Sequence, residues 1–157
     1  MRPVTETPTD PTHYATLSGV YASLLAGLVL AARRRRVPLR LDGPELAATG
    51  AATFALSKLV AHEKVETWLR VPFVEEEPGG ERHPRGEGLR YAVGELLTCS
   101  RCAGAWSALG IVGLRTLAPD AGRVVTAVLA ASAANDYLQS GFRLLCNRAN
   151  DAAGGSR

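Results

Sequence analysis

The feature that most constrains this chain is an uncharged run of nineteen residues, YATLSGVYASLLAGLVLAA, at positions 14–32. A helix of that length rises about 30 Å, which matches the hydrocarbon thickness of a bilayer. Four arginines, 33–36, follow directly and are typical of a cytoplasmic anchor. The run therefore predicts a transmembrane helix. The buried helix of a soluble domain is less favoured, because a chain of 157 residues has little left to bury it with.

Two further segments carry apolar runs of similar length. Residues 96–117 and 123–146 are separated by a short turn that contains Pro119 and Asp120. Because the connection is short, the two segments predict an antiparallel helical hairpin within the membrane.

Residues 44–62 are harder to place, because their uncharged core, 46–57, has only twelve residues. A core of that length is short for a span and typical of a re-entrant or interfacial helix. If 44–62 crosses the membrane, the flanking basic residues divide nine to seven between the two sides; if it stays on one face, they divide thirteen to three. The second division fits the positive-inside rule. We therefore predict an all-α integral membrane protein with three transmembrane helices plus one interfacial or re-entrant amphipathic helix, and four transmembrane helices as the alternative.

The same count predicts a multi-pass protein of the bacterial cell membrane, with its N-terminus outside and its C-terminus in the cytoplasm. The abundance of alanine, glycine and arginine is the reason for expecting a bacterial source. The lipid bilayer is then its first partner. Basic residues do not alternate with aromatic ones, so we expect no nucleic-acid partner.

These segments divide the chain into four predicted units. They are a disordered N-terminal segment (1–13), a transmembrane helix with its arginine anchor (14–40), a membrane domain (44–146) that contains a polar loop (75–90), and a disordered tail (147–157).

One face of the first helix repeats small residues at every fourth position. They are Ala15, Gly19, Ser23, Gly27 and Ala31. Small residues at this spacing let the backbone of another helix come close. We expect a homo- or hetero-oligomer that associates through such faces.

A Cys-x-x-Cys motif, Cys99 and Cys102, begins the second apolar segment, and Cys146 ends the third. Thiols three residues apart on a helix point the same way, and a helix N-terminus lowers the pKa of a thiol. The hairpin would bring Cys146 to the same membrane face. Three interpretations remain open: structural thiols, a redox pair, and a zinc site completed by His62 or His83.

Polar residues lie midway along the third apolar segment, at Asn135, Asp136 and Gln139. An ionisable residue at that depth is expensive and points to a function. Asp136 could pair with a basic residue and hold two helices together; the candidates are Arg143, Arg101 and Lys58. The alternative is a proton or ion relay.

Two stretches resemble a known family: ATFALSKLVAHEKVETWLRVPFVE (52–75) and GELLTCSRCAGAWSALG (94–110). The second carries Glu-Leu-Leu-x-Cys-x-x-Cys-x-x-x-Trp, and the chain is similar over 52–146 to the bacterial domain-of-unknown-function family 1360. The resemblance implies a small membrane protein and supplies no reaction. It groups a set of charged residues that we expect at the cytoplasmic interface near the thiols: Lys58, Glu63, Lys64, Arg70 and Glu95.

No phosphate loop, nucleophile elbow or zinc-protease motif is present, so we predict no catalytic residues and, zinc aside, no cofactor. The first functional hypothesis is a non-enzymatic accessory or assembly component of the membrane. The second is a thiol-based redox or zinc-binding protein that uses Cys99, Cys102 and Cys146. The third is a small transporter or channel subunit that uses Asp136.

Overall fold

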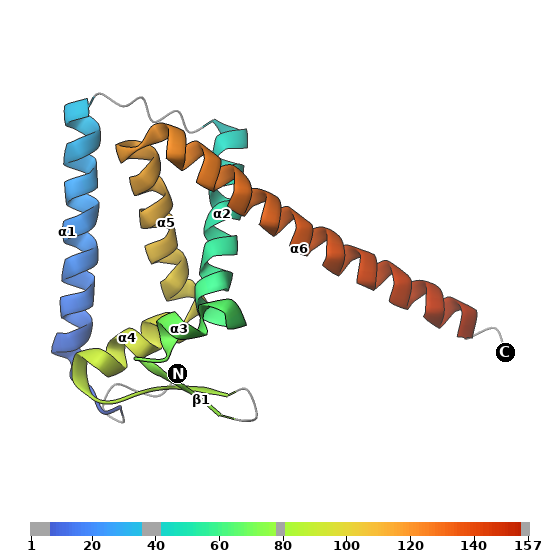
Figure 1. The fold of residues 1–157 in the computed structure, drawn as a ribbon, viewed down its shortest axis with the longest axis horizontal. Helices are drawn as coiled ribbons and strands as arrows, with labels where there is room; N and C mark the ends of the chain where they lie inside the picture. Colours follow the sequence, from blue (N-terminus) through green and yellow to red (C-terminus); the bar gives the residue numbers. More distant parts are fainter. Residues whose placement is uncertain (1–6, 36–41, 78–80, 155–157) are drawn as a thin grey trace.

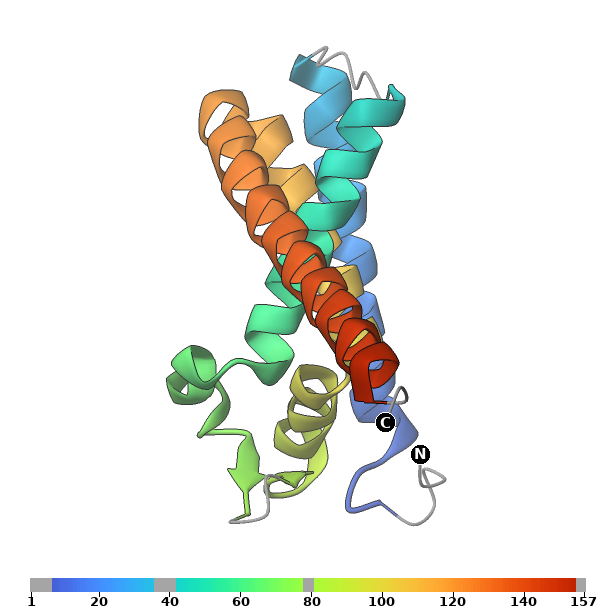
Figure 2. The ribbon, with the colours of Figure 1, turned by 90° about the vertical axis from the view of Figure 1, so that its right-hand side faces the viewer.

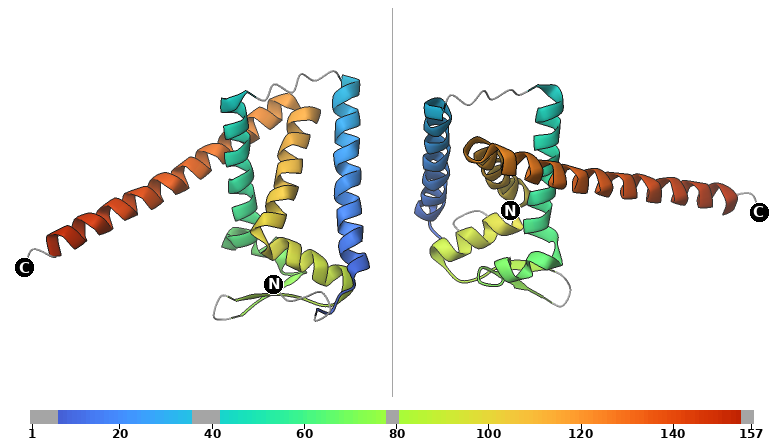
Figure 3. Two further views of the ribbon diagram at one scale, coloured as in Figure 1. Left: turned by 180° about the vertical axis from the view of Figure 1, so that it is seen from behind. Right: turned by 45° about the horizontal axis from the view of Figure 1, so that its top comes forward.

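Helices make up almost all of the computed structural model, which confirms the predicted all-α class. The described residues are 7–35, 42–77 and 81–154. The long helices are α1 (Pro11–Arg35), α2 (Gly43–His62), α5 (Ser100–Leu117) and α6 (Pro119–Gly154). Figure 1 and Figure 3 show α1, α5 and α2 side by side, while α6 leaves one end of this bundle obliquely.

The bundle has two chemically different ends. At one end, which we call the arginine end, Arg35 of α1 donates a hydrogen bond to the carbonyl of Leu117 at the end of α5 (2.7 Å). At the other, which we call the thiol end, His62 of α2 bonds the Ser100 hydroxyl (2.8 Å) beside Cys99. The arginine cluster and the thiols therefore lie at opposite ends of the bundle (Figure 1).

Helix α2 runs the whole distance between these ends. It begins at Asp42, whose carboxylate accepts from the backbone N–H of Glu45, and Pro44 stands in its first turn. Its twenty residues rise about 30 Å. It packs against both α5 and α6 through buried small residues, namely Thr49, Ala52, Ala55, Ser57 and Ala61. These small residues let α2 lie close to both neighbours.

Two arginines cap the far end of α2. Arg70, in the short helix α3 (Thr67–Arg70), is fully buried, and Arg82 begins strand β2 (Arg82–Pro84). They donate hydrogen bonds to the backbone carbonyls of Val60, Ala61 and His62 in α2 and of Glu63, the residue after it. Both guanidinium groups also lie 3.1 Å from Glu76 in strand β1 (Val74–Glu76). Carbonyls that a helix end leaves unpaired thereby find charged donors.

The hairpin of β1 and β2 lies under helix α4 (Gly88–Thr98), within the segment predicted as a polar loop. Gly94 of α4 touches this hairpin so closely that an added Cβ would collide with the carbonyl oxygen of Phe73. The 3-10 turn η2 (Lys64–Glu66) connects α2 to α3. The chain before α1 also reaches α4, since the Gly88 N–H donates to the carbonyl of Pro8 (2.9 Å).

A sharp break at Cys99 separates α4 from α5, and the two helices meet at 88°. α4 lies across the thiol end of the bundle, and α5 runs along it (Figure 1). The segment predicted as one span, 96–117, is therefore bent near its start.

Helix α6 crosses α2 (Figure 2) and then projects away from the bundle (Figure 1). Lys58 of α2 pairs with Asp136 (2.9 Å), and Phe54 stacks on Tyr137 with ring centroids 5.5 Å apart. Beyond Tyr137 the described side chains of α6 are exposed. The helix continues to Gly154, through residues that the sequence analysis assigned to the tail.

Candidate functional site

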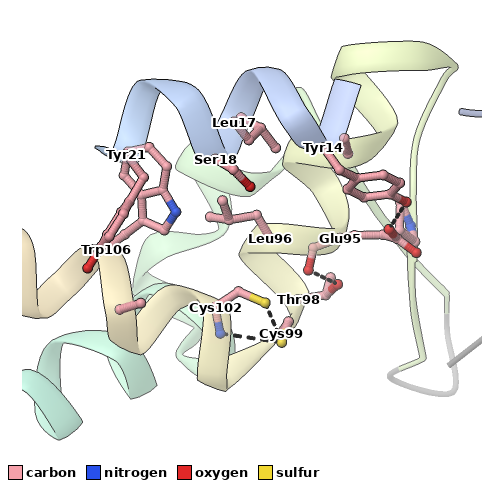
Figure 4. Close-up of a pocket in the computed structure, with 13 residues that line it drawn as sticks. Tyr14, Leu17, Ser18, Tyr21, Glu95, Leu96, Thr98, Cys99, Cys102 and Trp106 are labelled. Carbon is pink, nitrogen blue, oxygen red and sulfur yellow. Dashed lines mark hydrogen bonds between the residues drawn. The ribbon is translucent and has the colours of Figure 1, made fainter. Parts of the chain in front are cut away.

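The site begins at the break between α4 and α5. Cys99 is the residue before α5, and its sulfur accepts from the backbone N–H of Cys102 (3.4 Å). The Cys102 thiol lies 2.8 Å from the Cys99 sulfur (Figure 4). Both cysteines are partly buried and free. A pair at this spacing, at the start of a helix, is arranged for thiol–disulfide exchange.

The surroundings of Cys99 lower the pKa of its thiol below that of an ordinary cysteine. Burial raises its pKa, but hydrogen bonds from the Cys102 thiol and from the backbone N–H groups of Cys102 and Arg101 lower it. The charge of Arg101 lowers it further, and the net effect is a lowered pKa. Cys99 is therefore the better candidate for the attacking thiolate.

The two thiols line an open pocket of about 800 Å³ between α1, α4 and α5 (Figure 4). Five of the lining residues belong to the motif that marks the family resemblance, namely Glu95, Leu96, Cys99, Cys102 and Trp106. The opposite wall comes from one face of α1, namely Tyr14, Leu17, Ser18 and Tyr21. The motif residues thus share a single cavity.

This pocket is mainly apolar, with one carboxylate at its edge. The hydroxyl of Tyr14 donates a hydrogen bond to Glu95 across the gap between α1 and α4. At the other side, Tyr21 meets Trp106 edge to face, with ring centroids 5.4 Å apart and planes at 72°. Aromatic faces, thiols and one carboxylate are the groups that a ligand would meet here.

The predicted intramembrane polar residues separate into two kinds. Asp136 is paired with Lys58, one of the three partners that the sequence offered. Asn135 and Gln139 are exposed. This geometry favours the interhelical contact over a relay that needs an unpaired carboxylate.

The predicted interfacial charges have different roles. Lys58 also lies 3.6 Å from Glu63, and Lys64 is exposed in the turn after α2. Arg70 caps α2, and Glu95 lines the pocket. All five gather toward the thiol end.

Cys146 does not join the other two thiols. It is exposed on the part of α6 beyond Tyr137, whereas Cys99 and Cys102 lie partly buried at the break between α4 and α5. Within the described part of the chain, the three potential metal ligands found close together are Glu77, Glu81 and His83, all exposed on the hairpin. The predicted three-thiol zinc set is therefore not assembled.

The expectations from sequence did not include the wall that α1 contributes. Tyr14, Ser18 and Tyr21 recur at helical spacing on one face, but the face of this helix that we singled out was the small-residue one. The expectations also missed Arg82 and Glu76 as partners of Arg70. The periodicity of α1 could have identified the face, but nothing local indicates what faces it.

Comparison with known proteins gives one match. A family described as "Protein of unknown function (DUF1360)" matches residues 49–142, which confirms the predicted family. No curated protein and no solved structure matches. The match contains both cysteines of the pocket and leaves the α1 wall outside.

Proposed function

We propose that this chain, which belongs to the DUF1360 family of proteins of unknown function, is an integral membrane protein whose Cys99–Cys102 pair works as a thiol–disulfide couple. The observation that carries the proposal is the position of the two thiols, 2.8 Å apart on the wall of an apolar pocket. From the sequence alone, an accessory role was the first of the three functional hypotheses. The pocket favours the redox hypothesis, because a purely structural pair needs no cavity.

Insertion in a membrane is supported by α1. It is the one described helix that is long and apolar enough by itself to cross a bilayer, and α4 with α5 meets the test as a bent pair. None of the residues of α1 is buried. Its large apolar side chains are exposed along its length, including Val20, Leu24, Leu25, Val29 and Leu30. The exposure of these side chains to lipid costs no free energy, whereas their exposure to water does.

We base the proposed number of spans on the position of α2. Because α2 runs from the arginine end to the thiol end beside α5, we propose that it crosses with its neighbours, as in the four-helix alternative. The division of nine to seven basic residues gives no orientation for four spans, so we base the orientation on the first helix, which usually dominates: Arg33 and its neighbours follow it, and the arginine end is then cytoplasmic. The thiol end then faces outward. The cytoplasmic C-terminus predicted from sequence is not kept, since α6 begins at the arginine end.

An outward position suits a disulfide. Disulfides persist outside the cytoplasm, where thiol-reducing systems are absent. A dithiol substrate would reduce the Cys99–Cys102 disulfide. Its first thiolate attacks and forms a mixed disulfide with one cysteine, and its second thiol releases that bond, so that the substrate leaves as a disulfide.

The test uses a Cys146→Ser background, so that the pocket pair holds the only thiols. Spheroplasts and inverted vesicles are treated with a membrane-impermeant maleimide, with and without prior reduction. We expect no labelling before reduction, and two labels per chain in spheroplasts after it. Cys99→Ser and Cys102→Ser are the controls and should each show one label without reduction. Two thiols that stay free and resist a soluble disulfide would overturn the couple; labelling confined to inverted vesicles would overturn the orientation.

A further inference from the structure

We infer that the pocket beside Cys99 and Cys102 takes a lipophilic quinone, which accepts the two electrons of the dithiol. This inference rests on the proposed thiol–disulfide function and names the oxidant for it. A dithiol that becomes a disulfide must pass on two electrons and two protons. The half-buried pair lies on the wall of an apolar pocket, where an apolar acceptor reaches it more easily than a charged one.

The walls of the pocket suit a flat ring. Tyr21 and Trp106 offer aromatic faces at the side toward the middle of α1, and Leu17 and Leu96 add apolar surface (Figure 4). Rings of this kind pack in offset or edge-to-face geometries with centroids roughly 4.5–7 Å apart. A volume of about 800 Å³ falls in the range of small-molecule sites.

A second hollow lies next to the first and fits a hydrocarbon tail. It measures about 450 Å³, lies between α1 and α5, and shares Trp106 with the thiol pocket. Its lining is almost wholly apolar and includes Leu24, Leu28, Leu109 and Gly110. A molecule with a polar ring at the thiols and an apolar tail would lie along α1 and reach toward the arginine end. That shape is the shape of a membrane quinone.

The reaction balances without another component. Both S–H bonds break and one S–S bond forms between Cys99 and Cys102. The two electrons pass to the quinone ring, and the two thiol protons end on its two oxygens, so that a quinol leaves. The disulfide must then be reduced again by a dithiol substrate, which ends as a disulfide.

The test follows quinone absorbance and thiol content together. Reduced Cys146→Ser protein in nanodiscs is mixed, without oxygen, with a ubiquinone analogue that carries a ten-carbon tail. We expect one quinone reduced for each intramolecular disulfide formed. Ala105 is exposed and lines the pocket, so Ala105→Phe should slow the reaction at least about tenfold by filling it. Ala131→Phe, the same change at an exposed position on α6, should leave the rate unchanged.

A third variant tests the tail. No atom lies within 4 Å of a Cβ added at Gly110, so Gly110→Phe is expected to fold. It should slow the reaction of a long-tailed quinone and spare a tailless one.

Three outcomes would contradict the quinone, its site or the function on which the inference rests. A soluble disulfide that oxidises the pair where quinone does not would overturn the quinone and leave the couple standing. Equal rates for wild type, Ala105→Phe and Ala131→Phe would overturn the pocket as the quinone site. A pair that neither oxidant can convert would remove the proposed function as well. Should Ala105→Phe fail to fold, Leu96→Trp fills the same pocket and serves in its place.

Discussion

Lys58 and Asp136 lie 2.9 Å apart, from Nζ to Oδ2, and this ion pair joins α2 to α6. The two residues are 78 positions apart in the chain. Lys58 also approaches Glu63 at 3.6 Å, so one ammonium group serves two carboxylates. Asp136 is thereby part of a contact between helices, which explains a charge halfway along an apolar segment.

Removing one partner of this pair should destabilise the protein more than removing both. Lys58→Met leaves the Asp136 carboxylate without its partner, and Asp136→Asn leaves Lys58 only the longer contact to Glu63; the double change Lys58→Met with Asp136→Leu leaves an apolar contact. We expect the midpoint of thermal unfolding in detergent to fall for each single variant and to recover in the double one. Asn135→Ala, next to the pair and exposed, is the control. Single variants as stable as wild type would show that the pair contributes nothing.

Arg70 should be among the most sensitive positions of the chain. Its buried guanidinium caps α2 and meets Glu76, so Arg70→Met leaves the carbonyls of Val60 and Glu63 without their donor and takes from Glu76 one of its two arginines. We expect a loss of about 3–5 kcal/mol in the free energy of unfolding. Arg85→Met is the matched control, because Arg85 pairs with Glu75 at 3.6 Å in an exposed position. The control should cost less than about 1 kcal/mol. Equal losses for the two variants would contradict the cap.

Gly94 should not accept a side chain. Its added Cβ would meet the Phe73 carbonyl and Pro84, which ties α4 to the hairpin. We expect Gly94→Ala to cost about 1–3 kcal/mol in chemical denaturation. Gly104→Ala, in helix α5 with nothing within 4 Å of the new Cβ, should be neutral or stabilise by up to about 1 kcal/mol. If both changes stabilise the protein, α4 does not approach the hairpin as described.

The reactivity of Cys99 should depend on pH in a defined direction. Its pKa is lowered, so more of it is thiolate at a given pH than for a free thiol. The rate of its alkylation by iodoacetamide, measured by mass spectrometry in reduced Cys146→Ser protein, should reach half its maximum at a lower pH than that of a short cysteine peptide. Cys102→Ala removes a hydrogen bond that stabilises the thiolate, so the midpoint should rise. A midpoint at or above that of the peptide would contradict this account.

The sequence by itself determined the helices and the family. Apolar runs of span length predict α1, α5 and much of α6, because helix formation and bilayer length are both local matters. The stretches 52–75 and 94–110 indicated the DUF1360 family, and the family match over 49–142 confirms it. The proline and acidic residue at 44–45 similarly marked the start of α2.

Only the tertiary structure decided what these elements do to one another. The pocket shared with α1, the choice of Lys58 for Asp136, and the separation of Cys146 from the other thiols all involve segments far apart in the chain. Helical periodicity says which residues share a face, but it does not say which other face covers it. That is decided by close packing, here of the small residues of α2 against α5 and α6, which fixes the direction of each helix and so the chemistry at each end of the bundle.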